Sequence, residues 1–373
     1  MAKVKPSKKG AKGSSKAPSL AAVRNQIDRL DRDLVGLMNQ RAKLAHRIGQ
    51  IKESAGQEAY DPSRETEVMA RIVTFNKGPL SDCSLKAVFR ELISGSRALE
   101  KQLRVSYLGP AYSYTHLAAI HRFGQSVELV PVGTIAAVFE ELNRGHAHYG
   151  MVPIENSTDG RITDTLDMFT RLPAKICGEV QLHIHHHLLG RCARADVQEV
   201  YSKPQALSQC RNWLTKHLPT ARTVEVTSTS TAAQLAQDKP GAAAIASIQA
   251  GVHYGLNVLA ENIEDVQGNL TRFAVIGHHA GQRTGSDKTA LMFEIEHKPG
   301  ALADSLGIFK RNRLNLTWIE SYPIPRSEKG YFFFVELEGH QTEPRLRKAI
   351  ESLERRAVRL VILGSYAKTA PVD

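Results

Sequence analysis

The 373-residue sequence is poor in cysteine and has no long apolar segment. Its four cysteines show no CxxC spacing, which excludes the usual zinc and redox motifs and favours reduced thiols in a cytoplasmic protein. No run approaches the roughly 20 apolar residues of a membrane span, so we expect no membrane segment. Neither a GxGxxG fingerprint nor a P-loop is present, so we expect no nucleotide cofactor.

Acidic residues are missing from residues 1–19, which hold six lysines. The formal net charge of +11 therefore falls to about +5 over the rest of the chain, which is only mildly basic. The segment also lacks the apolar core of a secretory signal, so we interpret it as a disordered basic tail and expect no nucleic-acid or membrane partner. Weak attraction of this tail to nucleic acid or a membrane surface is the alternative.

The histidine-rich run LHIHHHLL at 182–189 is a candidate metal site. On a strand, His183, His185 and His187 would share one face, but no cysteine or carboxylate lies nearby in the sequence to complete a ligand set. We therefore interpret the run as a polar strand face beside an anion pocket, and we expect no bound metal.

Apolar residues between positions 20 and 51 recur in steps of three and four, which predicts one long helix with a coiled-coil-like stripe. Arg41 interrupts this stripe, and Lys52 lies three turns further on, on nearly the same face and about 16 Å along the axis. Two cations that face one buried space indicate an anionic ligand, because an unpaired buried charge is costly. Arg24 lies about 25 Å from Arg41 on a straight helix, so it could serve such a pocket only in a partner chain.

Two further helices are expected in this region. The first starts at the pair Asp61-Pro62, an N-cap followed by proline, and ends at Gly78-Pro79; the second is expected over 82–103. Any one inward polar group is more often part of a structural salt bridge, but a basic excess on three inward faces favours an anionic ligand. The polar side chains of these two helices that join the candidate pocket are Asp61, Arg64, Glu65, Ser96 and Glu100.

The stretch VRNQIDRLDRDLVGLMNQR, followed by IK, YDPSRE and the spacing from Ser96 to Glu100, resembles the all-helical chorismate mutase family over residues 20–103. The resemblance implies an intertwined homodimer in which the first-helix arginine reaches the partner's site. The family's reaction is the pericyclic rearrangement of chorismate to prephenate, which needs no nucleophile and no proton transfer. Catalysis therefore consists of holding a dicarboxylate and stabilising charge on the breaking ether. The implied catalytic residues are Arg24, Arg41, Lys52 and Glu100, and the implied substrate-binding residues are Asp61, Arg64, Glu65 and Ser96.

Glu100 stands where the family often has glutamine, which is a permanent hydrogen-bond donor. A glutamate donates only when it is protonated, so mutase activity should weaken as pH rises through the pKa of Glu100. The alternative is that Glu100 only pairs with Arg41 or Lys52.

Residues 104–281 alternate short apolar runs with helical patterns, which is typical of βα units around a largely parallel sheet. Ligands bind at the carboxyl ends of such strands. Polar groups follow predicted strands in four stretches, which are GPAYSYTH (109–116), PIENSTDG (153–160), SKPQALSQ (202–209) and NLTRF (269–273).

These stretches, with THLAA, QC after YSKPQ and the run VTSTSTAA, resemble the prephenate dehydratase family over 104–281. The resemblance implies two α/β lobes like those of periplasmic binding proteins, with the active site in the cleft and no cofactor. Tyr112 replaces a glycine that is common in the family, so we expect a differently shaped turn there. The implied catalytic residues are Asn156, Gln209 and Thr271, with Thr271 as hydroxyl donor, and the implied substrate-binding residues are Ser113, Ser202 and Arg272, with Arg272 as a carboxylate clamp.

Residues 287–368 show a strand and helix order of βαββαβ, which predicts a ferredoxin-like split motif. With PGALADSL and NLTWIESYP, this region resembles an ACT domain, an amino-acid-sensing module. Tyr322 replaces the arginine of the family's usual Glu-Ser-Arg-Pro motif, which puts phenylalanine sensing in question. The residues that match the family's phenylalanine-binding motifs are Gly300, Ala301, Leu302, Glu320 and Ser321.

We therefore predict a multidomain cytoplasmic enzyme with an all-α mutase domain, an α/β two-lobed dehydratase domain and an α+β ferredoxin-like ACT domain. It would convert chorismate to prephenate and prephenate to phenylpyruvate, as a homodimer or higher oligomer under feedback inhibition by phenylalanine. The alternatives are a dehydratase whose mutase domain serves only for dimerisation, a dehydratase that Tyr322 prevents from sensing phenylalanine, and a non-enzymatic ligand-binding regulator. The presence of both sets of site residues favours the bifunctional enzyme.

Overall fold

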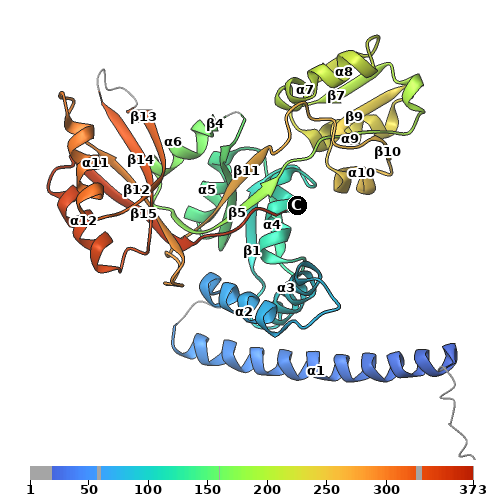
Figure 1. Ribbon diagram of the computed structural model, residues 1–373, viewed down its shortest axis with the longest axis horizontal. Helices are drawn as coiled ribbons and strands as arrows, with labels where there is room; N and C mark the ends of the chain where they lie inside the picture. Colours follow the sequence, from blue (N-terminus) through green and yellow to red (C-terminus); the bar gives the residue numbers. More distant parts are fainter. Residues whose placement is uncertain (1–18, 57–59, 159, 325–329, 373) are drawn as a thin grey trace, which may run out of the picture.

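The computed structural model describes four stretches of the chain, which are residues 19–56, 60–158, 160–324 and 330–372. The basic tail predicted at 1–19 lies outside these stretches except for Ser19, whose hydroxyl accepts a hydrogen bond from the backbone N–H of Ala22 and caps the first helix. Figure 1 shows a long helix at one end of the molecule, two α/β lobes above it, and a further sheet beside the first lobe.

Three helices form the N-terminal region, and each begins at a side-chain cap. Asp61 accepts from two backbone N–H groups at the start of the second helix, and Ser81 caps the third. The third helix ends earlier than the predicted Leu103, so Glu100 lies in the turn that follows it. The helices are α1 (Leu20–Ser54), α2 (Pro62–Phe75) and α3 (Asp82–Ala98).

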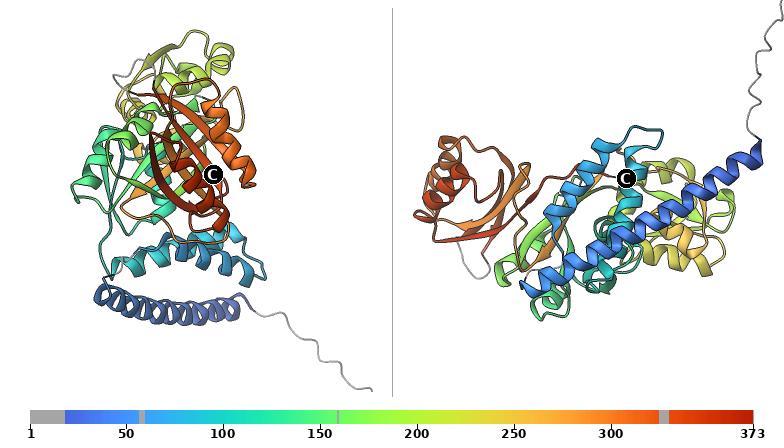
Figure 2. Two further views of the ribbon diagram at one scale, coloured as in Figure 1. Left: turned by 90° about the vertical axis from the view of Figure 1, so that its left-hand side faces the viewer. Right: turned by 90° about the horizontal axis from the view of Figure 1, so that it is seen from below.

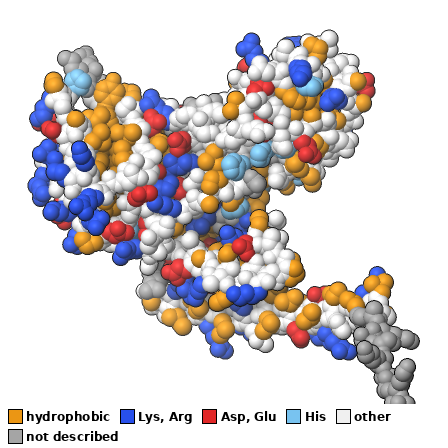
Figure 3. Space-filling view, viewed as in Figure 1, with side chains coloured by type: hydrophobic (Ala, Val, Ile, Leu, Met, Phe, Trp, Pro, Cys, Tyr) orange, Lys and Arg blue, Asp and Glu red, His pale blue; other side chains and the backbone are white. Residues whose placement is uncertain are grey.

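The apolar stripe of α1, predicted to be buried, lies open to solvent in the single chain. Leu30, Leu34 and Leu37 are 61%, 49% and 60% exposed, and Figure 3 shows hydrophobic side chains along this helix. The views in Figures 1 and 2 agree that α1 runs as a rod beneath the other helices. The reason is length, because the 35 residues of α1 present more apolar surface than the 17-residue α3 packed against it can cover.

The first α/β lobe is built on a sheet with the strand order β2-β1-β3-β11-β5, and β4 pairs with β3. β1 runs parallel to β2 and β3, whereas β11 is antiparallel to both β3 and β5, so the sheet is mixed rather than largely parallel. Its strands are β1 (Arg104–Leu108), β2 (Glu128–Val132), β3 (Tyr149–Asn156), β4 (Gly160–Arg161), β5 (Lys175–His183) and β11 (Leu270–Gly277), and its helices are α4 (Tyr114–Phe123), α5 (Ile135–Asn143) and α6 (Thr163–Arg171).

The second lobe has the strand order β10-β6-β9-β7-β8. All five residues of β9 (Ala242–Ala246) are buried, and their small side chains let the alanine-rich α9 (Thr229–Asp238) pack closely on the sheet. The other strands are β6 (His187–Gly190), β7 (Glu199–Ser202), β8 (Arg222–Glu225) and β10 (Asn257–Ala260), and the other helices are α7 (Pro204–Gln209), α8 (Arg211–His217) and α10 (Ile248–Tyr254), with the 3-10 turn η1 (Arg194–Asp196).

The C-terminal sheet is antiparallel with the order β13-β14-β12-β15, which is the strand order of the predicted ferredoxin-like motif. β13, which carries the second effector motif, is an edge strand. The elements are β12 (Asp287–Glu294), α11 (Ala301–Arg311), β13 (Leu316–Pro323), β14 (Tyr331–Glu338), α12 (Pro344–Glu354) and β15 (Arg359–Ala367).

One hydrophobic core joins the C-terminal sheet to the first α/β lobe. Trp318 and Phe334 of the C-terminal sheet belong to the same buried cluster as Leu166 and Ile176 of the lobe. The chain then returns to β5, where Val372 exchanges two backbone hydrogen bonds with that strand. The two regions therefore pack as one body along this face. Among the described helices, none has the length and apolar content that a bilayer crossing requires.

Candidate active sites

A cleft of about 820 Å³ lies between the two α/β lobes. Its walls are the ends of β3 and β11 and the loop before α4 on one side, and α7 and the start of α9 on the other. Arg161 and Lys203 line it, and no carboxylate lines it in the described part of the chain. Such a cleft presents positive charge and hydrogen-bond donors to a small acid.

A network of polar side chains crosses the cleft wall. The Asn156 amide nitrogen donates to Thr271 Oγ1 at 2.7 Å and to Asn269 Oδ1 at 3.0 Å. Asn269 in turn donates to Gln209 Oε1 at 2.9 Å, and Gln209 donates to Thr158 Oγ1 at 2.6 Å. Thr158 closes the ring by donating to Asn156 Oδ1. Because every amide has a partner on both its atoms, the network holds the orientation of each group.

Thr271 is 7% exposed and faces the cleft from the centre of the sheet, where β11 lies between β3 and β5. Its oxygen accepts from Asn156, and no described residue accepts its own hydroxyl hydrogen. That hydrogen can therefore point toward a ligand in the cleft.

His186 joins the same network from the second lobe's side. Its Nε2 lies 2.8 Å from Gln209 Oε1, and since a carbonyl oxygen only accepts, Nε2 carries the hydrogen. Burial lowers the pKa of His186, against the opposing effect of its hydrogen bond to Gln209. The imidazole is therefore neutral near pH 7 and acts as a donor that orients Gln209.

The loop before α4 closes one end of the cleft. Ser113, a predicted binding residue, caps α4 and lines the cleft. Tyr112 adopts a positive φ of 62°, so the turn keeps a glycine-like backbone despite the side chain. The Tyr112 ring stacks on His253 of the second lobe with centroids 3.9 Å apart, and this contact holds the unusual conformation.

A second, smaller cavity of about 110 Å³ lies among α1, α2 and α3. Arg41 donates to Ser96 Oγ at 3.1 Å across it, from α1 to α3. The residues predicted for this site that line the cavity are Arg41, Lys52, Asp61, Arg64, Glu65, Ser96 and Glu100.

The carboxylates and cations of this cavity differ in how they are held. Glu65 accepts from Arg97, and burial raises the pKa of Glu65 although Arg97 opposes the rise. Arg64 pairs with Glu67 at 2.8 Å, and Asp61 serves mainly as the cap of α2.

Glu100 packs against α1 at Gly49, where an added Cβ would come within 2.6 Å of the glutamate side chain. Burial raises the pKa of Glu100, and the charges of Lys52, His46 and Arg97 oppose the rise. Arg41 bonds to Ser96, not to Glu100, in the described contacts. Arg24 lies on the exposed arm of α1, and among the described residues it forms no ion pair.

Known proteins match both regions of the chain. The family model of prephenate dehydratase matches residues 105–281, and that of type II chorismate mutase matches residues 23–101. The bifunctional chorismate mutase/prephenate dehydratase of Aquifex aeolicus is 43% identical over 354 residues, which cover 94% of this chain and 98% of that protein. The protein of the same name from Pseudomonas aeruginosa is 40% identical over 356 residues, with coverage of 94% and 98%. The chain belongs to the bifunctional chorismate mutase/prephenate dehydratase family.

The solved structure of a prephenate dehydratase from Arthrobacter aurescens in complex with L-Phe is also similar, with a TM-score of 0.67 and 33% identity. It covers 71% of this chain, and 90% of its own length is matched. The predicted fold class and the two family resemblances are thereby confirmed: this chorismate mutase/prephenate dehydratase has a helical region, two mixed α/β sheets and a C-terminal antiparallel sheet.

One predicted site residue of this chorismate mutase/prephenate dehydratase, Arg272, does not reach the cleft. Successive residues of a strand face opposite sides of the sheet, so Thr271 and Arg272 cannot both face a ligand on one side. The same alternation on β3 puts Asn156 in the cleft and its neighbour Glu155 behind it, and the strand register pairs Arg272 with Glu155. Arg272 is therefore a residue of the sheet's other face, and its assignment as a carboxylate clamp is corrected.

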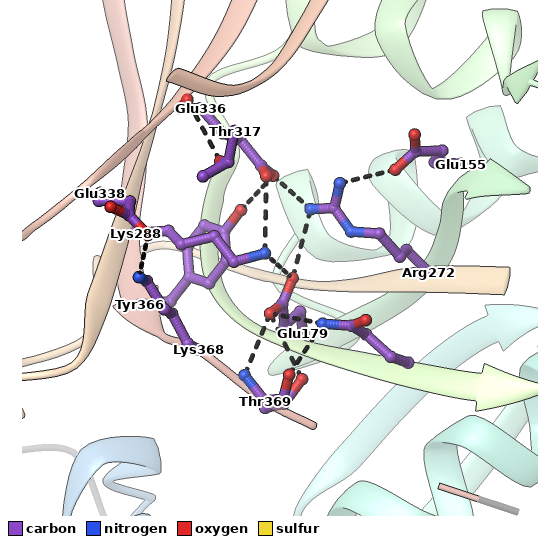
Figure 4. Close-up of polar contacts among 11 residues, drawn as sticks. Glu155, Glu179, Arg272, Lys288, Thr317, Glu336, Glu338, Tyr366, Lys368 and Thr369 are labelled. Carbon is purple, nitrogen blue, oxygen red and sulfur yellow. Dashed lines mark hydrogen bonds and ion pairs between the residues drawn. The ribbon is translucent and has the colours of Figure 1, made fainter. Parts of the chain in front are cut away.

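Behind the sheet, Arg272 enters a buried ionic network with the C-terminal sheet (Figure 4). It donates to Glu155 at 2.7 Å, to Glu336 at 2.5 Å and to Glu179 at 3.3 Å. Lys288 of β12 also pairs with Glu179, at 2.8 Å. Three carboxylates and two cations thus lie between the dehydratase lobe and the C-terminal sheet. Through Arg272, the strand that carries Thr271 takes part in this network.

Ser202 is another predicted residue that does not reach the cleft. It is fully buried at the end of β7, its hydroxyl donates to the carbonyl of Ile245 at 2.8 Å, and it is not among the residues that line the cleft. Its neighbour Lys203 lines the cleft, as do Gln205 and Gln209 of the same stretch.

The histidine run is not one strand, because β5 ends at His183 and β6 begins at His187. The rings of His183, His185 and His187 still follow one another, with centroids 6.3 and 6.5 Å apart, but the histidine that lines the cleft is His186. His185 lies 3.0 Å from Glu264, a carboxylate distant in sequence. In the described stretches, no group of three or more histidine, cysteine and carboxylate residues is placed to hold a metal ion.

The predicted effector motifs occupy two elements of the C-terminal sheet region. Gly300 has a positive φ of 82° and precedes α11, whose first residues are Ala301 and Leu302. Glu320 and Ser321 lie on β13, where Arg161 of the dehydratase lobe donates to the Glu320 carboxylate and the Ser321 carbonyl. Tyr322, which replaces the family arginine, donates to Asp167 of α6 at 2.9 Å.

Five residues of the two sites were not predicted. His186 and Asn269 lie in stretches that the sequence had marked as polar. Strand alternation, however, had drawn attention to His183, His185 and His187 instead of His186. Lys203 is the second residue of the stretch SKPQALSQ and directly precedes α7. Arg97 and Arg161 gave no signal, because their partners lie in elements distant in sequence. The missed residues are Arg97, Arg161, His186, Lys203 and Asn269.

Proposed function

We propose that the chain rearranges chorismate to prephenate in the helical cavity and converts prephenate to phenylpyruvate in the cleft between the lobes. The observation that carries the second assignment is the cleft itself, where a threonine hydroxyl with a free hydrogen faces a space lined by cations and, among the described residues, by no carboxylate. A dicarboxylate with a leaving hydroxyl fits these groups.

In the dehydratase reaction, the bond between the ring and its carboxylate breaks, and carbon dioxide departs. The electron pair enters the ring, and the ring hydroxyl leaves as water after taking a proton. The Thr271 hydroxyl donates a hydrogen bond to that leaving group and relays a proton that comes from solvent, with Asn156 holding its oxygen. Gln209, oriented by His186 and Asn269, serves as a further donor to the substrate's oxygens. Ser113 adds a hydroxyl at the mouth of the cleft.

In the mutase reaction, cations hold the two carboxylates of chorismate and stabilise charge on the breaking ether oxygen. Arg41, fixed by Ser96, and Lys52 supply two of these cations within one chain. Glu100 donates to the same ether when it is protonated. Asp61, Arg64 and Glu65 shape the rest of the cavity.

The mutase site is completed by a second copy of the chain. The exposed stripe of α1 is the surface that a partner helix would cover, and Arg24 on the exposed arm would then enter the partner's cavity. A homodimer is therefore the smallest active assembly for the first reaction.

The two sites lie at opposite ends of one strand. Tyr149, at the start of β3, lines a cavity that shares Lys52 and Glu100 with the mutase cavity, whereas Asn156, at the strand's end, lines the dehydratase cleft. Eight residues of strand span about 23 Å. The two reactions of one chain therefore take place at separate sites.

The C-terminal region senses phenylalanine through Gly300, Ala301, Leu302, Glu320 and Ser321, and so inhibits the dehydratase. The A. aurescens relative, solved in complex with L-Phe, supports this assignment. The functional division follows the sequence, with a basic tail at 1–19, a mutase domain at 20–103, a dehydratase domain at 104–281 and a sensor at 287–368. The enzyme acts in the cytoplasm.

The test follows chorismate consumption and phenylpyruvate formation by the purified protein, with and without phenylalanine. Arg41→Ala should lose the first reaction only, and Thr271→Ala should accumulate prephenate. If the wild-type protein runs neither reaction but binds the compounds, a ligand-binding regulator replaces the enzyme assignment. If only the second reaction runs, the helical domain serves dimerisation alone.

A further inference from the structure

We infer that Arg161 binds the carboxylate that prephenate retains in its product, and that β13 of the C-terminal sheet positions Arg161 for this role. The inference rests on the proposed dehydratase function and names a binding residue for it. Arg272 faces away from the cleft, so the cations left to a dicarboxylate are Arg161 and Lys203, one from each lobe, among the described residues that line it.

The guanidinium of Arg161 is held at one end only. Its Nη1 donates to Glu320 Oε2 at 3.3 Å and to the backbone carbonyl of Ser321. No described residue accepts from its Nε or Nη2, which leaves N–H donors for a carboxylate in the cleft. The ion pair is partly exposed, with 38% of the Arg161 side chain open to solvent, so it contributes little to folding. Its geometric effect is to fix where the guanidinium points.

The chemistry decides which of the two substrate carboxylates Arg161 binds. The ring carboxylate leaves as neutral carbon dioxide, so a strong ion pair on it would stabilise the substrate more than the transition state and slow the reaction. The side-chain carboxylate keeps its charge throughout, so an ion pair there anchors substrate and transition state equally. A permanently charged, bidentate guanidinium suits this anchoring role.

The same contacts place the predicted effector motif next to the cleft. Glu320 and Ser321 belong to β13, and Figure 1 shows α6 and β4 next to this strand, on the side of the first lobe. Arg161 is thus a substrate-binding residue whose direction is set from the C-terminal sheet. Removing the Glu320 charge should therefore weaken substrate binding although Glu320 does not line the cleft.

The experiment measures kcat and KM for prephenate, the inhibition constant of phenylpyruvate, and mutase turnover in the full-length protein. The variants are Arg161→Ala, Arg161→Lys and Glu320→Gln. The matched control is Arg171→Ala, because Arg171 lies in the adjoining α6, pairs with Asp167 at 2.7 Å and does not line the cleft.

We expect Arg161→Ala to raise KM about 10- to 100-fold, the effect of losing hydrogen bonds to a charged group, with a much smaller change in kcat. The inhibition constant of phenylpyruvate should rise by the same factor, because the product keeps the bound carboxylate. Arg161→Lys should recover part of the loss, and Glu320→Gln should raise KM by a smaller factor. Arg171→Ala should leave both constants unchanged.

A KM for Arg161→Ala equal to that of Arg171→Ala would overturn the inference. A raised KM with an unchanged phenylpyruvate constant would overturn the assignment to the retained carboxylate. If Arg161→Ala fails to fold, seen as lost mutase turnover and a lower melting temperature, Arg161→Lys decides between the outcomes through the same two constants. Absence of dehydratase turnover in the wild type would instead contradict the proposed function, so the two failures are distinguishable.

Discussion

The two catalytic regions differ in how much of their site a single chain covers. Both walls of the dehydratase cleft come from one chain, and its first lobe shares a buried core with the C-terminal sheet. Arg24, which the family resemblance implies for the mutase site, does not line the mutase cavity of its own chain, and the stripe beside that cavity is exposed. This difference supports the proposal that the second site is self-contained and that the first depends on assembly.

The largest expected effect comes from placing charge on the α1 stripe. The double variant Leu30→Glu and Leu34→Glu should prevent two α1 helices from packing, and mutase turnover should fall about 1,000-fold because the partner's arginine is lost. Dehydratase turnover should stay near the wild-type value. Light scattering and the two assays on the same sample check this.

Arg32→Glu is the control for the stripe variant, since it puts the same charge about 200° around the helix from Leu34. It should leave both the mass of the assembly, measured by light scattering, and the mutase turnover unchanged. A monomeric stripe variant with full mutase turnover would show that one chain makes a complete mutase site.

The next effect tests the self-contained cleft. Thr271→Val keeps the shape of the side chain but removes the hydroxyl that faces the cleft, and dehydratase turnover should fall about 100- to 1,000-fold. Thr271→Ser should retain much of the activity, and mutase turnover should not change in either variant. Equal dehydratase rates for the valine and serine variants would remove Thr271 from the reaction.

The third effect concerns the shared face behind the cleft. Arg272→Ala leaves Glu179 and Glu336 with Lys288 as their remaining cation in the network, and it should cost about 3–5 kcal/mol of stability. Urea unfolding curves, with dehydratase activity as the probe, measure this loss of unfolding free energy. Arg144→Ala breaks an exposed ion pair with Glu140 and should cost less than about 1 kcal/mol. Similar urea midpoints for the two variants would mean that the buried network contributes little to the stability of the fold.

The smallest effect is the pH dependence of the mutase. Burial raises the pKa of Glu100, so its carboxyl stays protonated and able to donate below that raised pKa and loses the hydrogen above it. Mutase kcat/KM should therefore fall as pH rises, by up to tenfold per pH unit.

His46, Lys52 and Arg97 also face Glu100, and their charges act on its carboxyl group. Glu100→Gln separates them, because a permanent donor should flatten the profile. A profile that keeps its slope in Glu100→Gln would assign the titration to another of these groups.

Polar residues at strand ends were predictable, whereas their directions were not. Asn156 follows an apolar run, and Thr271 belongs to the polar stretch NLTRF, so the pattern marked both stretches, while the family resemblance assigned the two residues to the site. Arg272 belongs to the same stretch and was placed in the cleft with Thr271. Strand alternation allows only one of two neighbours to face the ligand, and which one does so depends on the face that the second lobe covers.

For the stripe of α1, the direction of the side chains was predictable, but what covers them was not. Its period correctly predicted one continuous helix and an apolar face, because spacing along a helix reports which residues share a side. The period could not show that α3 is too short to cover that face within one chain.

Helix and strand order follows from local patterns, since caps, periodicity and strand ends depend on near neighbours in the chain, and the family motifs of the sequence indicated the two sites and most of their polar residues. The pairing of Arg161 with β13, the burial of Arg272 among three glutamates and the entry of His186 into the cleft depend on strands far apart in sequence. Tertiary packing brings these elements together, and it alone sets which face of each strand meets a ligand and which meets another sheet.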